Sequence, residues 1–285
     1  RYIFTQLSTA TELLFRPEDA PLYDYLEDDG QSIEPSYYMP IIPMILVNGA
    51  NGIGTGWSTT IPSYNPTDII LNIKRMLTGS PALGMTPWFK DFEGVVVATD
   101  EDKYAIEGKY EWRNASTVHI SELPVGTWTN NYKEFLESWQ EGTGKYKSGQ
   151  LLTIKCNHTD TKVSFTAKLA PQFAESLRTD EKKFKKAFKL VSTTSTGNMH
   201  AFGTSGSMNK YSNVLDILTE FFHERLKLYS RRKAHQIECL QEIISKLDNK
   251  IRFLSETVAG TISFKGKRKQ ELILELETKG CLKQT

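Results

Sequence analysis

Apolar residues recur at helical spacing along the last quarter of the chain. From residue 213 onward the sequence favours helix almost throughout, and Ala259 and Gly260 end the longest stretch. Residues 267–280 predict either a further helix or half of a returning hairpin. The strongest repeat has spacings of 3, 4, 3, 4 and 3, which is typical of a coiled-coil seam and requires a partner helix from this chain or from a second copy. Its positions are Ile237, Leu240, Ile244, Leu247, Ile251 and Leu254.

The middle of the chain, residues 88–212, has a different pattern. Short runs rich in β-branched residues alternate with turn residues, which is typical of strands. Residues 132–139 and 181–188 predict short helices between them. We therefore expect a mixed α/β region of moderate size. The predicted strands lie within residues 93–98, 103–112, 116–123, 151–158 and 162–169.

The first part of the chain predicts three local elements. Residues 1–15 favour a strand that enters a helix, which Pro17 ends. Asp29-Gly30 is the dipeptide of a tight hairpin turn, so we expect short strands beside it. Residues 65–77 predict a helix, because a capping asparagine and a proline suit its first turn and apolar residues then recur at helical spacing.

The composition is that of a globular chain. With 285 residues, 39% of them hydrophobic, there is enough apolar material for a core and for roughly two domains. No stretch approaches the about 18 uninterrupted apolar residues of a membrane span, and no leader segment is visible, so we expect a soluble intracellular protein. Three widely separated cysteines argue against a disulfide framework. Because the chain begins at Arg1 without a methionine, we expect a fragment of a larger protein.

The charge balance leaves nucleic-acid binding open. A formal net charge of +1 argues weakly against it, but local patches matter more than totals. Two basic patches are present, at residues 225–233 and 265–269. A solvated helix face and a surface loop are the alternative interpretations of these patches.

A run of glycines, NGANGIGTGWS at residues 48–58, encloses one bulky residue, Ile53. Glycine lets a backbone pass where side chains cannot. Two interpretations follow from the residues alone: Ile53 fills a core, or the glycines let a ligand approach and Ile53 touches it.

Most common catalytic motifs are absent from the sequence. The glycine run lacks the third glycine of a dinucleotide fingerprint, since Trp57 stands there, and residues 142–146 lack the last residues of a phosphate-binding loop. Cys156 and His158 supply two potential ligands where a structural zinc needs four. The acidic run at residues 27–29 is better explained as a charged turn than as a cation site. No metal site, catalytic triad or carboxylate pair is predicted.

One pair with chemical potential remains, Arg1 beside Tyr2. A phenol with a pKa near about 10 is a poor nucleophile at neutral pH, but a neighbouring cation, base or metal can activate it to attack phosphorus. The arginine would offer a planar donor fork for a phosphate or for the charge that develops on it. By itself the pair is a weak signal, because most such pairs are structural.

Several longer stretches make the interpretation specific, because together they resemble the breakage-reunion region of eukaryotic type II (type IIA) DNA topoisomerases. Their order and spacing agree over nearly the whole chain. The block PMILVNGANGIGTGWS is long enough to make a chance match negligible. The stretches are RYIFTQL, EPSYYMPIIPMILVNGANGIGTGWSTTIPSYNP, ISELPVGTWTNNYKEFL and KYSNVLDILTEFFHERLKLYSRRK.

The resemblance implies roles for the first two residues. Tyr2 matches the tyrosine that attacks a DNA backbone phosphate and becomes linked to the 5′ end. Arg1 matches the arginine that steadies the transition state. The cleavage is a transesterification, so the energy of the phosphodiester bond is conserved and resealing needs no separate energy source.

The resemblance also implies DNA contacts. Ile53 matches an isoleucine that intercalates between base pairs and bends the duplex, which favours the ligand-touching interpretation of the glycine run. Trp128 lies in a segment that contacts the DNA flanks in the family, with an ordinary packed tryptophan as the alternative. Gly126 and Asn51 stand where many relatives have a basic and an acidic residue, so one phosphate contact is in doubt; neither departure touches the chemistry.

The fold implied is α+β and multi-domain. The C-terminal part of a winged-helix domain would occupy residues 1–64, a mixed α/β tower domain residues 65–212, and the start of a coiled coil leading to an exit gate residues 213–285. The resemblance implies a nuclear, homodimeric enzyme that acts on double-stranded DNA, with no membrane partner. Its ATPase domain, its acidic metal-binding domain and the ligands of its Mg²⁺ would lie outside this segment, so this piece alone should not cleave DNA.

Two other classes of function stay open at this point. A non-catalytic architectural protein could bend DNA with Ile53. A purely structural coiled-coil dimer would have no DNA affinity.

Overall fold

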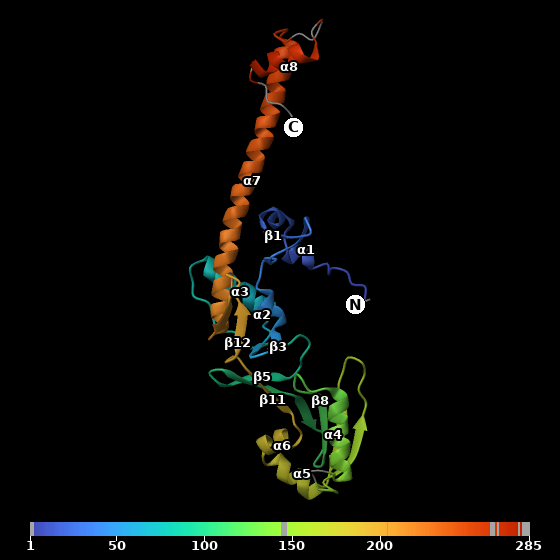
Figure 1. Ribbon diagram of the computed structural model, residues 1–285. Helices are drawn as coiled ribbons and strands as arrows, with labels where there is room; N and C mark the ends of the chain where they lie inside the picture. Colours follow the sequence, from blue (N-terminus) through green and yellow to red (C-terminus); the bar gives the residue numbers. More distant parts are fainter. Residues whose placement is uncertain are drawn as a thin grey trace. The chain divides into compact units, whose positions relative to one another are not determined.

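The computed structural model describes residues 3–143, 147–203, 205–262, 266, 268–278 and 280. Arg1 and Tyr2 therefore lie outside the described residues, as do residues 144–146. The described chain forms two compact units, one from Arg1–Ile41 together with His223–Thr285 and the other from Ile42–Phe222. The fold class is confirmed at the level of a mixed α+β chain with a long C-terminal helix (Figure 1).

The first unit contains a hairpin between two short helical segments and the long helix. The Asp29-Gly30 turn is confirmed: both residues have positive φ, 47° and 75°, which suits a tight turn between strands. The elements are α1 (Thr11–Leu14), the 3-10 helix η1 (Pro17–Leu22), β1 (Tyr25–Asp28), β2 (Gln31–Pro35) and the short α8 (Lys269–Thr278).

The strand predicted at the start of residues 1–15 is wrong for the part that the structure describes. Residues 3–10 form neither strand nor helix, and α1 is only four residues long. Ile3, Phe4 and Leu7 are almost fully exposed. A strand needs a neighbour to take its backbone hydrogen bonds, and none of the described strands pairs with this segment.

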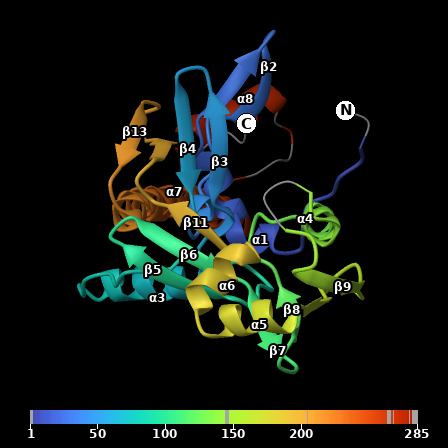
Figure 2. The ribbon, with the colours of Figure 1, turned by 90° about the horizontal axis from the view of Figure 1, so that it is seen from below.

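The second unit contains antiparallel sheets, as the runs of β-branched residues predict. One sheet has the order β7-β8-β10-β9 and another the order β11-β6-β5 (Figure 2). The strands are β5 (Val95–Asp100), β6 (Lys103–Glu107), β7 (Lys109–Trp112), β8 (Thr117–Glu122), β9 (Leu151–Cys156), β10 (Phe165–Leu169) and β11 (Val191–Ser195).

Helices of the second unit confirm the predicted segments and add two short ones. The predicted cap is present, since the Asn65 side chain accepts a hydrogen bond of 2.9 Å from the Thr67 backbone N–H. Within the described residues, no helix is both long and apolar enough to cross a membrane. The helices are α2 (Met44–Asn48), α3 (Pro66–Leu77), α4 (Thr129–Glu141), α5 (Pro171–Arg178) and α6 (Glu181–Ala187).

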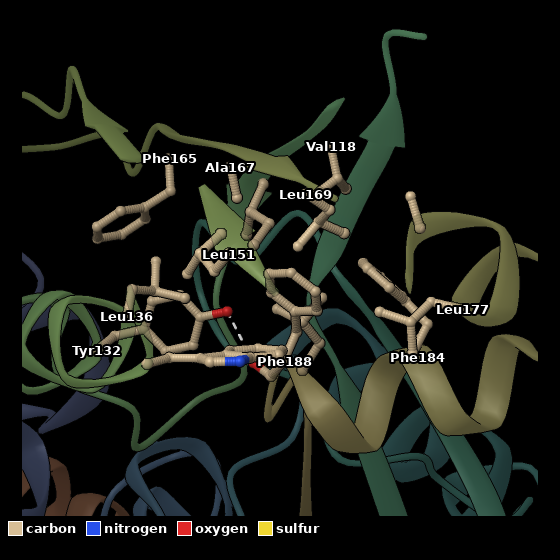
Figure 3. Close-up of a cluster of buried hydrophobic side chains, with 14 of the residues drawn as sticks. Val118, Tyr132, Leu136, Leu151, Phe165, Ala167, Leu169, Leu177, Phe184 and Phe188 are labelled. Atoms are coloured by element: carbon tan, nitrogen blue, oxygen red, sulfur yellow. Dashed lines mark hydrogen bonds between the residues drawn. The ribbon is translucent and has the colours of Figure 1, made fainter. Parts of the chain in front are cut away.

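The largest hydrophobic core lies between the four-stranded sheet and helices α4, α5 and α6 (Figure 3). It is rich in aromatic rings, and Trp139, Tyr132 and Phe184 are almost completely buried. Tyr132 keeps its polar atom satisfied there, because its hydroxyl donates a hydrogen bond of 2.7 Å to the Phe188 carbonyl.

We expect Tyr132→Phe to lower the free energy of unfolding by about 1–2 kcal/mol. The shape of the ring is kept, but the buried Phe188 carbonyl loses its donor. The loss should appear as an earlier chemical-denaturation midpoint. Tyr104→Phe is the matched control, because Tyr104 is only partly buried. An equal loss in both variants would contradict this account.

The long helix α7 (Val214–Val258) contains the predicted seam (Figure 1). It ends just before Ala259 and Gly260, as predicted, and Gly260 has a positive φ of 76°. The six seam residues are 45–61% exposed, so no described helix covers them. Pairing with a second copy and the division of the chain at residues 64 and 212 stay predictions.

Candidate nucleic-acid interface

The glycine run folds as a hairpin, not as an irregular loop. Strand β3 (Ala50–Gly54) pairs antiparallel with β4 (Trp57–Ile61), and Ile53 lies directly opposite Ser58. Gly56 turns the chain between the strands with a φ of 78°. Strict pairing over five residue pairs therefore fixes which face of the hairpin each side chain occupies.

The fold requires glycine at some positions of this hairpin and not at others. At Gly49, φ is 68° and a Cβ atom would lie 2.7 Å from the Ile61 carbonyl oxygen, so the fold itself excludes a side chain there. At Gly52 no atom lies within 4 Å of the position of a Cβ, and at Gly54 only the Trp57 carbonyl oxygen does, at 3.7 Å. The fold thus has room for side chains on both sides of Ile53.

Ile53 is 93% exposed, which rules out the core-filling interpretation within the described chain. An isoleucine that fills a core would be almost fully buried. Of the two interpretations of Ile53, core filling is therefore excluded and contact with a ligand stays a prediction. The side chain is exposed near the turn of the hairpin, between two glycines.

Strand β4 of this hairpin rests on a second hairpin, formed by β12 (Met199–Phe202) and β13 (Met208–Tyr211). Figures 1 and 2 both show the two hairpins side by side. The Thr60 backbone N–H donates a hydrogen bond of 2.8 Å to the Asn198 carbonyl. The rings of Trp57 and His200 meet edge to face, with centroids 5.5 Å apart.

Trp128 is 76% exposed, so it does not pack as a core tryptophan within the described chain. It occupies the cap position before α4. Gly126, two residues earlier, has a φ of 86°, a conformation that favours glycine. Exposure of such a large apolar ring suits a contact with another molecule, but no described group identifies that molecule.

The basic patch at residues 225–233 is partly structural. Arg225 is buried, and its Nη1 donates to Asp19 Oδ2 at 2.7 Å. Arg232 Nε donates to the other oxygen of Asp19 at 2.7 Å. The ring of Tyr229 lies 4.3 Å from the first guanidinium and 5.0 Å from the second. Neither the solvated-face interpretation nor the nucleic-acid interpretation predicts this arrangement.

The other predicted groups can be placed only in part. Arg1 and Tyr2 lie outside the described residues, so their distances to Ile53 and Trp128 stay untested. In the second basic patch, Lys265 and Lys267 also lie outside them. Among the residues that are described, no three His, Cys, Asp or Glu side chains gather as a metal site would require.

Comparison with known proteins finds relatives that match nearly the whole chain. The family model for the A subunits of DNA gyrase/topoisomerase IV matches residues 1–283. DNA topoisomerase 2 of Candida albicans is 42% identical over 97% of this chain, and human DNA topoisomerase 2-alpha is 42% identical over 98%. These matches cover 19% and 18% of the two relatives, so the chain spans about a fifth of their length.

A solved structure gives the same result for the fold. The crystal structure of the Plasmodium falciparum topoisomerase II DNA-binding, cleavage and re-ligation domain superimposes with a TM-score of 0.87 at 40% identity. The match covers 99% of this chain and 38% of that one. Since both the family model and the fold match extend over nearly the whole sequence, the chain belongs to the eukaryotic type II DNA topoisomerases and matches their breakage-reunion region.

Proposed function

We propose that this chain forms the DNA gate of an ATP-dependent type II topoisomerase. The gate cuts both strands of one duplex, lets a second duplex pass and reseals the break, which relaxes supercoils and separates linked circles. Family membership supports this function. The observation in the structure that carries its DNA-bending part is the bare hairpin tip, where Ile53 is 93% exposed between two glycines that the fold does not require. The cutting part rests on family membership.

The cutting step is assigned to Tyr2. Its phenolic oxygen loses its proton and attacks a backbone phosphorus, the bond from phosphorus to the 3′ oxygen breaks, and the leaving 3′ oxygen takes up a proton. The products are a 5′-phosphotyrosyl bond and a free 3′ hydroxyl, and resealing runs the same exchange backwards. Arg1 stabilises the charge that develops on the phosphate. Such electrostatic stabilisation of the transition state is usually the largest contribution to the rate enhancement. Holding the phenolic oxygen in line with the phosphorus lowers the barrier further.

The bending step is assigned to Ile53. An aliphatic wedge in the minor groove unstacks one base step, at a cost of a few kcal/mol, and kinks the duplex by about 20–90°. The bare glycines beside Ile53 allow the backbone to approach the groove closely. The energy needed depends on how deformable the DNA is, so bending selects the site with little direct reading of bases. Trp128 is proposed to contact the flank of the bent duplex.

The finer domain assignment is also part of this proposal. Residues 1–64 would complete a winged-helix domain, residues 65–212 would form the tower, and residues 213–285 would begin the coiled coil of the exit gate. The exposed seam of α7 supports a partner helix, and a homodimer would place two copies of Tyr2 on one duplex, one for each strand. As in its eukaryotic relatives, we place the protein in the nucleus.

The Mg²⁺ ligands and the ATP site are assigned to other parts of the enzyme. Among the residues that the structure describes, no three His, Cys, Asp or Glu side chains gather as a Mg²⁺ site would require. An acidic metal-binding domain and an ATPase domain of the same enzyme would supply them. When bound, Mg²⁺ would neutralise charge on the reacting phosphate.

A non-catalytic architectural DNA binder remains the alternative, because exposure of Ile53 supports bending and not cutting. Covalent trapping on the complete enzyme separates the two. Labelled DNA stays on the protein after denaturation only if a covalent bond has formed.

We expect Ile53→Ala in the complete enzyme to reduce DNA bending strongly and cleavage by about tenfold, because alanine is too short to unstack a base step. Affinity should fall by only about two- to threefold, since phosphate contacts dominate it. Energy transfer across a doubly labelled duplex measures the bend. Ile33→Ala is the matched control, an exposed isoleucine on strand β2 of another hairpin. A full bend in the Ile53 variant would rule out the wedge.

A further inference from the structure

The hairpin that carries Ile53 cannot be stiff by itself. It has only two strands, and such isolated hairpins are marginally stable in water. Its tip adds little, because Gly52 and Gly54 have no side chains and Ile53 packs against nothing in the described chain. A wedge that unstacks bases must resist the force it applies. The stiffness must therefore come from what holds strand β4, the partner of the strand that carries Ile53.

One threonine connects the hairpin to strand β12 through both of its hydrogen-bonding capacities. The Thr59 hydroxyl donates a hydrogen bond of 2.8 Å to the His200 carbonyl. The same oxygen accepts a hydrogen bond of 3.0 Å from the His200 backbone N–H. Thr59 lies directly opposite Gly52, one pair away from Ile53. The Thr59 side chain therefore links β4 to the backbone of β12 through two hydrogen bonds.

The residue opposite Ile53 is held from the same side. The Ser58 hydroxyl accepts a hydrogen bond of 2.8 Å from the Asn198 side-chain amide. The Ser58 carbonyl oxygen lies 3.1 Å from His200 Nδ1. Because a carbonyl only accepts, the proton of this bond must sit on Nδ1. Ser58 is thus held through both its side chain and its backbone. The Trp57 ring packs edge to face with the same imidazole.

We propose that Thr59, Asn198 and His200 are positioning residues that fix the direction in which Ile53 is presented to DNA. They come from two segments of the chain some 140 residues apart and meet along strand β4, opposite Gly52 and Ile53. This inference rests on the proposed wedge function of Ile53. It adds that the wedge works as one body with β12. Loss of the hydrogen bonds between β4 and β12 should therefore reduce the bend in the DNA although Ile53 itself is unchanged.

The decisive variant is Thr59→Val in the complete enzyme. Valine keeps the shape and the strand preference of threonine but removes both hydrogen bonds to His200. Thr60→Val is the matched control, because the hydrogen bond between Thr60 and Asn198 uses its backbone N–H, which valine retains. We expect Thr59→Val to reduce the bend and to lower cleavage about tenfold, and Thr60→Val to leave both unchanged.

The bend must be measured with the DNA saturated by protein. A merely structural loss would lower thermal stability or affinity but would leave the bend angle of the bound complex unchanged. A reduced angle at saturation, with affinity within about threefold, supports positioning. A normal angle in Thr59→Val together with a reduced angle in Ile53→Ala overturns this inference alone. A normal angle in Ile53→Ala overturns the wedge, and this inference with it.

Histidine 200 supplies an independent pair of variants. In His200→Asn the side-chain amide can occupy the place of Nδ1 and still donate to the Ser58 carbonyl, whereas His200→Leu has a similar shape without a donor. We expect the asparagine variant to retain most of the bend and the leucine variant to lose it. Equal bends in the two variants would overturn the role of His200. This test does not depend on whether Thr59→Val folds.

Discussion

Replacing Tyr2 by phenylalanine in the complete enzyme should abolish covalent attachment of DNA. The reaction requires the phenolic oxygen itself, so its removal leaves no nucleophile, and we expect cleavage to fall by at least about 10³-fold. DNA affinity should stay within about threefold, because the many phosphate contacts are unchanged. Mixing enzyme with end-labelled duplex, denaturing it and measuring the label that remains on protein gives the result directly.

Tyr37→Phe is the matched control, since Tyr37 is an exposed tyrosine with no proposed role in the reaction. It should retain the full adduct. Persistence of the adduct in Tyr2→Phe would assign the chemistry to another residue. Absence of any adduct from the unsubstituted enzyme would instead favour the architectural alternative. A gel shift that weakens with added salt excludes the third class, a coiled-coil dimer without DNA affinity.

The sequence predicts the long elements of this fold well. The helices at residues 65–77 and from 213 onward have clear apolar periodicity and end signals, and the strands at residues 93–123 are rich in β-branched residues. These are local signals, and the structure keeps them because the packing does not oppose them. The opposite holds for residues 3–10, where none of the described strands pairs with a strand-like sequence.

The candidate site was predictable only as far as its tip. Glycines around Ile53 point to a special backbone, but a glycine-rich run does not look like a strand, so the hairpin was not predicted. Its support was not predictable either. Strands β12 and β13 are four residues long and rather polar, and nothing in the sequence of Thr59 or His200 indicates that they meet. Such contacts depend on chain topology, which one sequence does not display.

The buried cluster of the first unit shows the same limit for charges. In sequence, Asp19 is one of several acidic residues near a proline, and its arginine partners lie more than 200 positions away. In the structure, Asp19 is completely buried and each of its oxygens accepts from a different guanidinium. Two basic residues that a sequence would assign to DNA are thereby used to attach η1 to α7.

Asp19→Ala should therefore be the most damaging change to stability in the first unit. Removal of one partner from a buried ion pair costs about 3–5 kcal/mol, because the remaining charge is left without compensation. Here Arg225 is buried and would keep only the Met39 carbonyl and the face of Tyr229. Because a chain with two compact units need not unfold in one step, local amide hydrogen exchange is the suitable measurement. We expect exchange in η1 and in residues 225–232 to accelerate by about 10²–10³-fold.

Two further variants define the cause of that acceleration. Asp28→Ala removes an exposed carboxylate on β1 and should leave exchange in η1 unchanged. Asp19→Asn retains an oxygen that can accept from one guanidinium but carries no charge, so its effect should lie between wild type and Asp19→Ala. If Asp19→Asn behaved as wild type, the attachment would depend on hydrogen bonding alone. If Asp19→Ala itself left exchange unchanged, the attachment of η1 to α7 would have to come from apolar packing, and the buried charges would contribute no net stability.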